Sequence, residues 1–320
     1  MQHFVIDPTS TKPSLQNGPT SPSLPGPKET KVHSSSSGDE NASLFYVGAA
    51  TVIMLVYMYD REWEGIRLMT DPTFIRAGTR THTLSTRRID PAIFLEEMPR
   101  IDAILLSHYH REHFDRLIES SIRRDIPIIT TKSARSALCD PFTTVYGLDA
   151  YEGVLVNVKK GGARLQPRWR VTAVPGKHGP TETHGFMVEL GYGPAGQTSN
   201  DLQIGYTMYI TGDTLFDNKL HEEIKTRYKH VDLMLVHLGS VSVPSPRMGA
   251  LSMRMSMDGK QGVELIRKIG PGVTIPIHYD GSDLFRGSLD EFRREVQSRG
   301  GGFELVCLER GGVYRFNVST

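Results

Sequence analysis

Cysteine is nearly absent from this chain, which has only Cys139 and Cys307 among 320 residues. Two cysteines without a paired framework provide neither a disulfide scaffold nor a thiolate metal site. The amino terminus also lacks the basic start and apolar run of a secretory signal. We therefore expect an intracellular, cytoplasmic protein.

An excess of charge is missing as well, because the formal net charge is +1. No basic or acidic run exceeds a few residues, so the sequence has no electrostatic footprint for a nucleic acid. We expect a small-molecule substrate and no nucleic-acid partner. The sequence leaves the oligomeric state open.

The chain has no long hydrophobic run. Its most apolar stretch, LFYVGAATVIMLVYMY at residues 44–59, is shorter than the roughly 20 residues of a membrane-spanning helix. The β-branched and aromatic residues of this stretch, with the internal Gly48, predict two buried strands. The sequence therefore predicts no transmembrane segment.

The first 42 residues are rich in Ser, Pro, Thr and Gly and poor in apolar residues. Such a composition buries too little apolar surface to offset chain entropy. We predict a disordered N-terminal tail over residues 1–42 and one large folded domain over residues 43–320.

Within the folded part, strands and helices alternate. Strands are predicted at 66–70, 101–106 and 126–130, with a helix at 115–124. The middle is sheet-rich, with strands near 154–158, 171–174, 185–190 and 206–210, and a second alternation follows residue 231. This order predicts an α/β fold, and a single sandwich of layers is favoured over two domains.

The strongest functional pattern is ILLSHYHREHFD, from Ile104 to Asp115, an apolar strand that leads into a group of metal-ligand residues. In an extended segment, residues two apart project to the same side. His108 and His110 can therefore bind one ion, while Glu112 and His113 face a second. Imidazole and carboxylate without thiolate suit zinc first, and manganese or iron as alternatives.

Three further ligand candidates follow predicted strands. They are His178 in VPGKHGP, Asp213 in YITGDT and His278 in IPIHYDG. Each residue alone would more often be structural, as a turn residue, but four such segments in series favour a metal site.

The ordered motifs HxHxEH, KHG, GDT and IPIHYD resemble those of the metallo-β-lactamase-fold hydrolase superfamily, over about Ser43 to Phe316. The sequence looks closest to the subgroup with ascorbate-phosphate lactonases and the phospholipase D of N-acylethanolamine phospholipids. TDPTF, HLGS and MSMDGKQGVE add to that likeness. The resemblance implies a four-layer αβ/βα sandwich with its site at an open edge.

The resemblance also implies roles for the metal residues. His108, His110 and His178 match ligands of the first metal, and His113 and His278 match ligands of the second. Asp213 matches the carboxylate that bridges both ions. Asp71 matches a position that supports the loop, which we expect to orient a ligand, and a turn-initiating Asp before Pro72 is an equal alternative.

One residue departs from the family pattern, because Glu112 stands where the family has Asp. The extra methylene moves the carboxylate by about 1 to 1.5 Å, which is large against metal–oxygen tolerances near 0.2 Å. Two alternatives follow: Glu112 binds the second ion after local adjustment, or it acts as a base beside it. A one-metal enzyme is a third alternative.

These residues favour hydrolysis by a water that the metal activates, with Asp213 orienting it. The first hypothesis is a hydrolase of a small-molecule ester, lactone or amide. The second is a phosphodiesterase or phospholipase D-like enzyme, for which Arg111, Lys177 and Arg254 are candidate phosphate-binding groups. A mononuclear iron dioxygenase and an inactive binding protein are less favoured. His237, His184 and Asp258 are candidates for residues behind the metal ligands.

Overall fold

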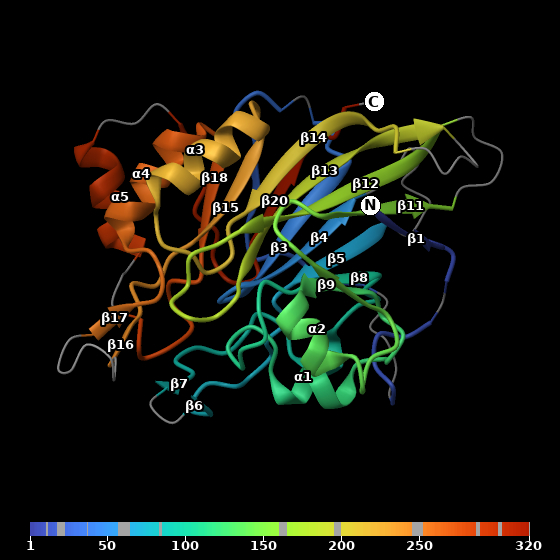
Figure 1. Ribbon diagram of the computed structural model, residues 1–320, viewed down its shortest axis with the longest axis horizontal. Helices are drawn as coiled ribbons and strands as arrows, with labels where there is room; N and C mark the ends of the chain where they lie inside the picture. Colours follow the sequence, from blue (N-terminus) through green and yellow to red (C-terminus); the bar gives the residue numbers. More distant parts are fainter. Residues whose placement is uncertain are drawn as a thin grey trace.

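Two eight-stranded sheets dominate the computed structural model (Figure 1). The structure describes residues 1–10, 12–17, 23–36, 38–56, 65–82, 85–159, 165–194, 200–244, 252–285, 289–299 and 303–319. The first sheet has the order β1 (Gln2–Ile6), β11 (Gly153–Val158), β12 (Leu165–Pro175), β13 (His184–Pro194), β14 (Gln203–Ile210), β15 (Leu233–His237), β18 (Val273–Ile277) and β19 (Glu304–Leu305).

The second sheet is built mainly from the amino-terminal half of the chain. Its order is β10 (Val145–Leu148), β9 (Ile128–Thr131), β8 (Ala103–Leu105), β5 (Ile66–Thr70), β4 (Thr51–Val56), β3 (Ala42–Gly48), β20 (Val313–Phe316) and β2 (Thr30–Val32). Two short hairpins join β6 (Arg80–His82) to β7 (Ser85–Thr86) and β16 (Ser242–Pro244) to β17 (Ser252–Arg254), and a 3₁₀ turn spans Leu95–Glu97.

Helices cover the outer faces of both sheets (Figure 1). The helices α1 (Arg116–Ser121) and α2 (Lys132–Leu138) lie on the side of the second sheet, and α3 (Asn218–Arg227), α4 (Gly259–Ile269) and α5 (Leu289–Ser298) lie on the side of the first. The four layers form an αβ/βα sandwich, which confirms the predicted fold class.

Alternation along the strands explains the layers. In β3, Leu44 and Tyr46 enter the core between the two sheets, whereas Phe45 and Val47 enter the core under α1 and α2. A strand whose successive side chains are all apolar is thus buried on both faces. This double burial also explains the apolar run at residues 44–59, whose last three residues lie outside the described part.

The predicted elements from residue 66 onward largely have the predicted type. The strand predicted at 66–70 is β5, and the predicted helix at 115–124 is the shorter α1, with Asp115 as its N-cap. The helices α2 and α3 were not predicted. Within the described residues, none of the helices combines the length and apolar character that a membrane crossing needs.

The prediction of a disordered tail over residues 1–42 is wrong for the parts that the structure describes. Strand β1 pairs in parallel with β11, and β2 pairs in parallel with β20. Both segments satisfy their backbone hydrogen-bonding groups at the edges of sheets that the rest of the chain builds. A polar segment can therefore be ordered by pairing, which composition alone does not reveal.

The parallel strands point their carboxyl ends at one edge of the sandwich. In the second sheet β5, β8 and β9 are parallel, and in the first sheet β14, β15 and β18 are parallel. The segments after these strands hold most of the predicted site residues. Carboxyl ends of parallel strands are where α/β folds place their binding sites.

Candidate metal centre

The loop after β8 is fixed at both ends. His113 and Phe114 both donate their backbone N–H to the carbonyl of His110, over 2.9 and 2.7 Å, which closes a tight turn. Asp115 then caps α1 by accepting from the backbone N–H of Ile118 at 2.8 Å, and it accepts from that of Phe74 at 2.6 Å. The histidines are thus presented from a loop with little freedom to move.

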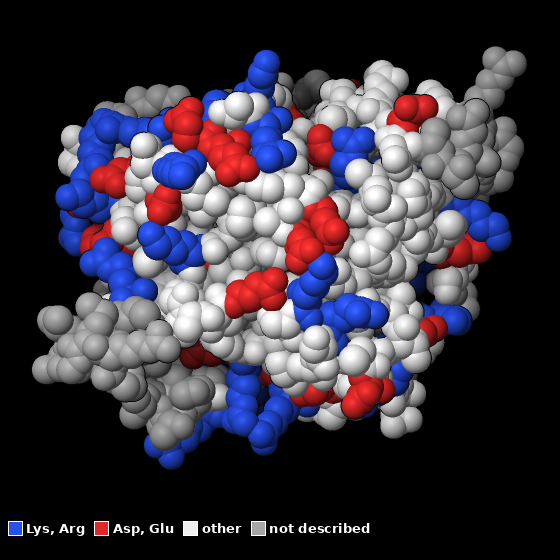
Figure 2. Space-filling model, in the orientation of Figure 1, with Lys and Arg blue, Asp and Glu red and all other residues white. Residues whose placement is uncertain are grey.

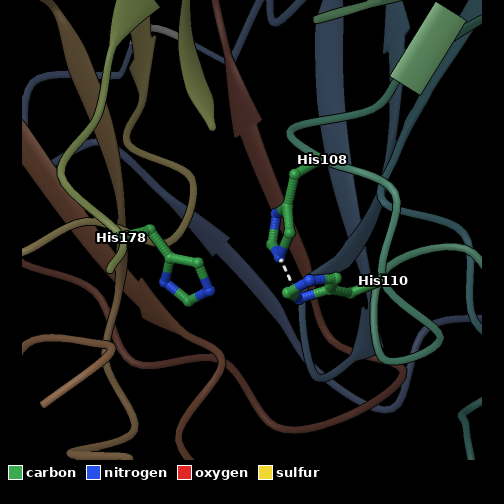
Figure 3. A group of neighbouring side chains, drawn as sticks. All are labelled: His108, His110 and His178. Atoms are coloured by element: carbon green, nitrogen blue, oxygen red, sulfur yellow. Dashed lines mark hydrogen bonds between the residues drawn. The ribbon is translucent and has the colours of Figure 1, made fainter. Parts of the chain in front are cut away.

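The first donor group contains His108, His110 and His178, whose ring nitrogens lie within 4.8 Å of one another. Figure 3 shows His178 approaching from a separate loop toward the other two rings. Its Nδ1 donates to the carbonyl of Met255 at 2.7 Å, which leaves Nε2 as the atom available to an ion. This is the trio that the family resemblance assigned to the first metal.

The second donor group contains His108, His113 and Asp213, again within 4.8 Å. Asp213 Oδ2 lies 3.4 Å from His113 Nε2, and Asp213 Oδ1 lies 3.0 Å from His278 Nδ1. His278 is therefore adjacent to this group but not a member of it, and His108 belongs to both groups. Asp213 contacts residues on either side, as expected for a carboxylate between two positions.

Asp71 lies behind the histidines and holds them. One carboxylate oxygen accepts from the backbone N–H of Ser107 at 2.7 Å, and the other from the Ser107 hydroxyl at 2.9 Å. The second oxygen also lies 3.0 Å from His113 Nδ1. Such a contact fixes the ring orientation and leaves Nε2 toward the site. This geometry agrees with the predicted positioning role.

The backbone is unusual at two of these positions. Asp71 and His278 have φ angles of 34° and 62°, which side-chain-bearing residues seldom adopt. Gly212 has a φ of 61°, and a Cβ there would lie 2.7 Å from the carbonyl oxygen of His184. Only glycine fits where β14 turns toward Asp213. Strained residues grouped at one edge are typical of functional sites.

Burial and neighbouring charges set the pKa values of the inner residues. Burial lowers the pKa of His113, but the carboxylates of Asp213 and Asp71 outweigh it and raise this pKa to about 10. Burial raises the pKa of Asp71, but His113 outweighs it and lowers the value to about 2. The pKa of Asp213 is likewise held well below its usual value, because His278 and His113 outweigh burial.

The pKa values of His108 and His110 move the other way. Burial, followed by repulsion from His113 and His178, holds the pKa of His108 well below its usual value. His110 is exposed at the rim of the site, yet desolvation and repulsion from the same two histidines lower its pKa to about 4. Both rings are therefore neutral near pH 7, as metal ligation requires.

The donor set fits a divalent cation. It offers imidazole nitrogens and a carboxylate, without sulfur. His278 Nε2 is buried and has no hydrogen-bond partner among the described residues, a deficit that a cation would remove. A cation would also replace the charge that His113 carries between two carboxylates. The chemistry of these donors suits zinc, with manganese and iron as alternatives.

Glu112 is placed differently from the other predicted ligands. Its Oε1 accepts a hydrogen bond from Ser85 Oγ at 2.8 Å, and that hydroxyl also lies 2.6 Å from Ser282 Oγ. Glu112 lies in neither donor group. The carboxylate would have to leave Ser85 to bind an ion, so its roles as ligand and as base both stay predictions.

The predicted residues behind the ligands have separate places. His237 is fully buried, with Nε2 3.8 Å from Asp71 Oδ2, and lies against the site. His184 is buried 4.0 Å from Glu182, outside the lining of the central cavity. Asp258 is the N-cap of α4. Neither His184 nor Asp258 lines that cavity.

A cavity of about 570 Å³ opens over the donor groups. Of the three predicted phosphate-binding residues, Arg111 lines it, whereas Lys177 pairs with Asp217 at 3.0 Å and Arg254 pairs with Asp258. Arg116, which sequence reasoning missed, lines the cavity too. Its place three residues after His113, at the start of a predicted helix, was the available signal.

The layers, the strand-end loops and the paired donor groups together define the metallo-β-lactamase fold. A family model described as "Beta-lactamase superfamily domain" matches residues 67–279. The chain belongs to this superfamily, which confirms the resemblance at that level. The narrower likeness to lactonases and phospholipases stays a prediction.

Known proteins with similar sequences or structures agree with this assignment. The chain is 27% identical over 224 residues to a "UPF0173 metal-dependent hydrolase" of Archaeoglobus fulgidus, which covers 69% of this chain and 84% of that protein. The isothiocyanate hydrolase from Delia radicum gut bacteria superposes with a TM-score of 0.64 at 14% identity, over 86% of this chain and 99% of the other. Igni18, a metallo hydrolase from Ignicoccus hospitalis, superposes with a TM-score of 0.57 at 18% identity, over 87% of this chain and 99% of the other. The two structures establish a shared fold.

Proposed function

We propose that this protein is a metal-dependent hydrolase, with zinc as its metal, that cleaves a small-molecule ester, lactone or amide. The observation that carries the proposal is the meeting of two donor groups, which share His108, at the floor of one cavity. The cavity volume of about 570 Å³ suits a small molecule. The name of the archaeal relative, a metal-dependent hydrolase, supports the same class.

The bound cation would lower the pKa of a water and polarise the bond to be cleaved. Asp213, kept ionised by His113 and His278, would accept a hydrogen bond from the attacking water and orient it. Val241, Met255 and Leu284 supply an apolar wall for the substrate.

A second candidate is hydrolysis of a phosphodiester. Arg111 and Arg116 at the cavity wall favour it, because guanidinium groups bind phosphate oxygens in a forked geometry. The two chemistries can use the same donor groups. They differ in how strongly turnover depends on the arginines.

The test is hydrolysis of a chromogenic lactone and of bis(4-nitrophenyl) phosphate by zinc-loaded protein. Asp213→Ala serves as the blank, and Asp140→Ala is the matched control, since Asp140 is exposed on the surface. Lactone turnover that the first variant abolishes and the second retains supports the proposal. Preference for the phosphodiester would replace carbonyl with phosphoryl chemistry. Turnover that is equal in wild type and Asp213→Ala would overturn both.

A further inference from the structure

A second cavity of about 420 Å³ adjoins the one over the metal centre. The two cavities share Thr81, Arg111 and Arg116 in their linings. The second extends away from the histidines toward the 3₁₀ turn at Leu95–Glu97. A molecule bound at the metal centre can therefore continue past the two shared arginines.

Four arginines line this second cavity: Arg76, Arg80, Arg111 and Arg116. Figure 2 shows basic side chains gathered at the lower edge of the molecule, where β6, β7 and α1 lie in Figure 1. We call these four residues the arginine pocket. They come from two separate segments of the chain, residues 76–80 and 111–116, so no single run of basic residues in the sequence reveals them.

The ion pairs of Arg111 and Arg116 decide whether these two arginines can bind a ligand. The lining holds two carboxylates, Glu96 and Asp115, and both oxygens of Asp115 accept backbone N–H groups, from Phe74 and Ile118. Within the ranges that the structure describes, no ion pair to a carboxylate is formed by the side chains of Arg111 and Arg116. Their donors are therefore available to a ligand.

The pocket also has an ordered wall. The guanidinium of Arg76 stacks over the ring of Phe94, 3.8 Å from its centroid. Stacking fixes the plane of a guanidinium while leaving its N–H groups free at the edge. Several such groups around one hollow favour a planar or tetrahedral oxyanion over a neutral group.

Resting on the function proposed above, we infer that the substrate carries an anionic group, carboxylate or phosphate, remote from the bond that is cleaved, and that the arginine pocket binds it. Arg111 and Arg116 stand between the two cavities and contact the anion at its near side. The metal centre acts on the other end of the molecule. This assigns the substrate class as a small acid ester, lactone or amide with a charged tail.

The test measures how zinc-loaded protein hydrolyses three 4-nitrophenyl esters with six-carbon acyl chains. 4-Nitrophenyl hexanoate has a neutral tail, 4-nitrophenyl hydrogen adipate ends in a carboxylate, and a 6-phosphooxyhexanoate ester ends in phosphate. Wild type should favour one or both anionic esters in kcat/KM, through a lower KM. The double variant R111Q/R116Q should lose about tenfold on them, consistent with loss of hydrogen bonds to a charged group, and less than twofold on the hexanoate. Which anionic ester responds more identifies the anion.

Arg294→Gln is the matched control, because Arg294 is an exposed arginine on α5. This variant should have the wild-type kcat/KM on all three esters. Added salt should reduce the preference of the wild type for the anionic esters. Equal KM values for neutral and anionic esters in wild type, or equal losses in R111Q/R116Q, would overturn the inference while leaving hydrolysis intact.

Calorimetric titration with inorganic pyrophosphate separates this inference from the proposed function. If no ester is turned over, weaker pyrophosphate binding by metal-free R111Q/R116Q than by metal-free Arg294→Gln supports the arginine pocket as an anion site, whatever the lactone assay shows for the hydrolase proposal. Identical binding by the two variants would overturn the pocket as well.

Discussion

The two halves of the metal centre are built in different ways. The inner half contains Asp71, His113, Asp213 and His278, each no more than 5% exposed. The outer half consists of His110 and Glu112, which line the cavity together with His113 and Asp213 but are less buried, His110 being exposed. Hydrogen bonds and ion pairs join every inner residue to another, whereas Glu112 is held by the Ser85 hydroxyl.

This difference assigns separate tasks to the two halves. Buried carboxylates and imidazoles in fixed contact lose little freedom when an ion arrives, so the inner half is preorganised. The outer half faces the substrate and can adjust to it. The inner half should therefore dominate metal affinity and stability, and the outer half should influence substrate binding.

The largest effect should come from the carboxylate between the donor groups. Asp213→Asn keeps the shape of the side chain but removes its charge, so both zinc affinity and turnover should fall by more than about 100-fold, beyond the losses typical of residues behind the ligands. Zinc titration against a competing chelator measures the affinity. Asp140→Asn, the exposed control, should behave as wild type.

Asp71→Asn should have the next largest effect. The amide can still accept from the backbone N–H of Ser107, but it no longer offers a carboxylate to His113 Nδ1. Loss of such an orienting group lowers metal affinity or activity by about 10- to 100-fold. The same titration measures it, and an unchanged zinc affinity would show that Asp71 does not orient His113.

The inner half also predicts a pH dependence in the metal-free protein. Although burial opposes it, Asp213 and Asp71 raise the pKa of His113 from 6.5 to about 10. Because this pKa is higher in the folded protein than in the unfolded chain, the charged ring contributes its full stability below about pH 6.5. That contribution is lost as the pH rises through about 10. The advantage of wild type over Asp71→Asn, a few kcal/mol in the free energy of unfolding, should therefore shrink over that interval.

Urea unfolding in the presence of a chelator, repeated from pH 6.5 to 10, measures this advantage. With zinc bound, His113 is neutral and the pH dependence should disappear. A constant difference in the metal-free protein would show that the charge of His113 contributes nothing to stability.

The smallest effect is expected in the outer half. Glu112→Gln retains the length of the side chain and can still accept from Ser85, so zinc affinity should change less than about threefold, well below the losses typical of groups that orient a ligand. A fall above tenfold would indicate that Glu112 leaves Ser85 and binds the ion. Ser85→Ala, which removes the hydrogen bond but not the carboxylate, distinguishes that rearrangement.

Local patterns predicted the residues of the inner half well. Apolar strands lead into the site because parallel strands share an edge, and this explains why His113, Asp213 and His278 lie close together after β8, β14 and β18. The contact of Glu112 with Ser85 could not be predicted, because it depends on a hairpin that packs from another part of the chain. The pairing of β1 with β11 and of β2 with β20 was missed for the same reason. Each of these edge strands is ordered by a neighbour that is distant in sequence.

The arginine pocket illustrates the same limit. Arg111 was identified from its place in the metal loop, whereas Arg76 and Arg80 have no motif and reach the site only through the folding of the chain before and at the start of β6. Sequence spacing predicts ligands that lie on one loop or follow parallel strands. It does not predict a surface assembled from two distant segments.

The most direct measurement is the metal content of His108→Ala, because His108 belongs to both donor groups. After incubation with zinc and gel filtration, elemental analysis should find at least one equivalent in wild type and in His230→Ala, an exposed histidine that serves as the control. His108→Ala should retain less than about a tenth of that zinc. Losing a group that only orients a ligand lowers metal affinity by about 10- to 100-fold, and losing the ligand itself should lower it further. Wild-type zinc content in folded His108→Ala would contradict the assignment of the metal centre to this histidine cluster.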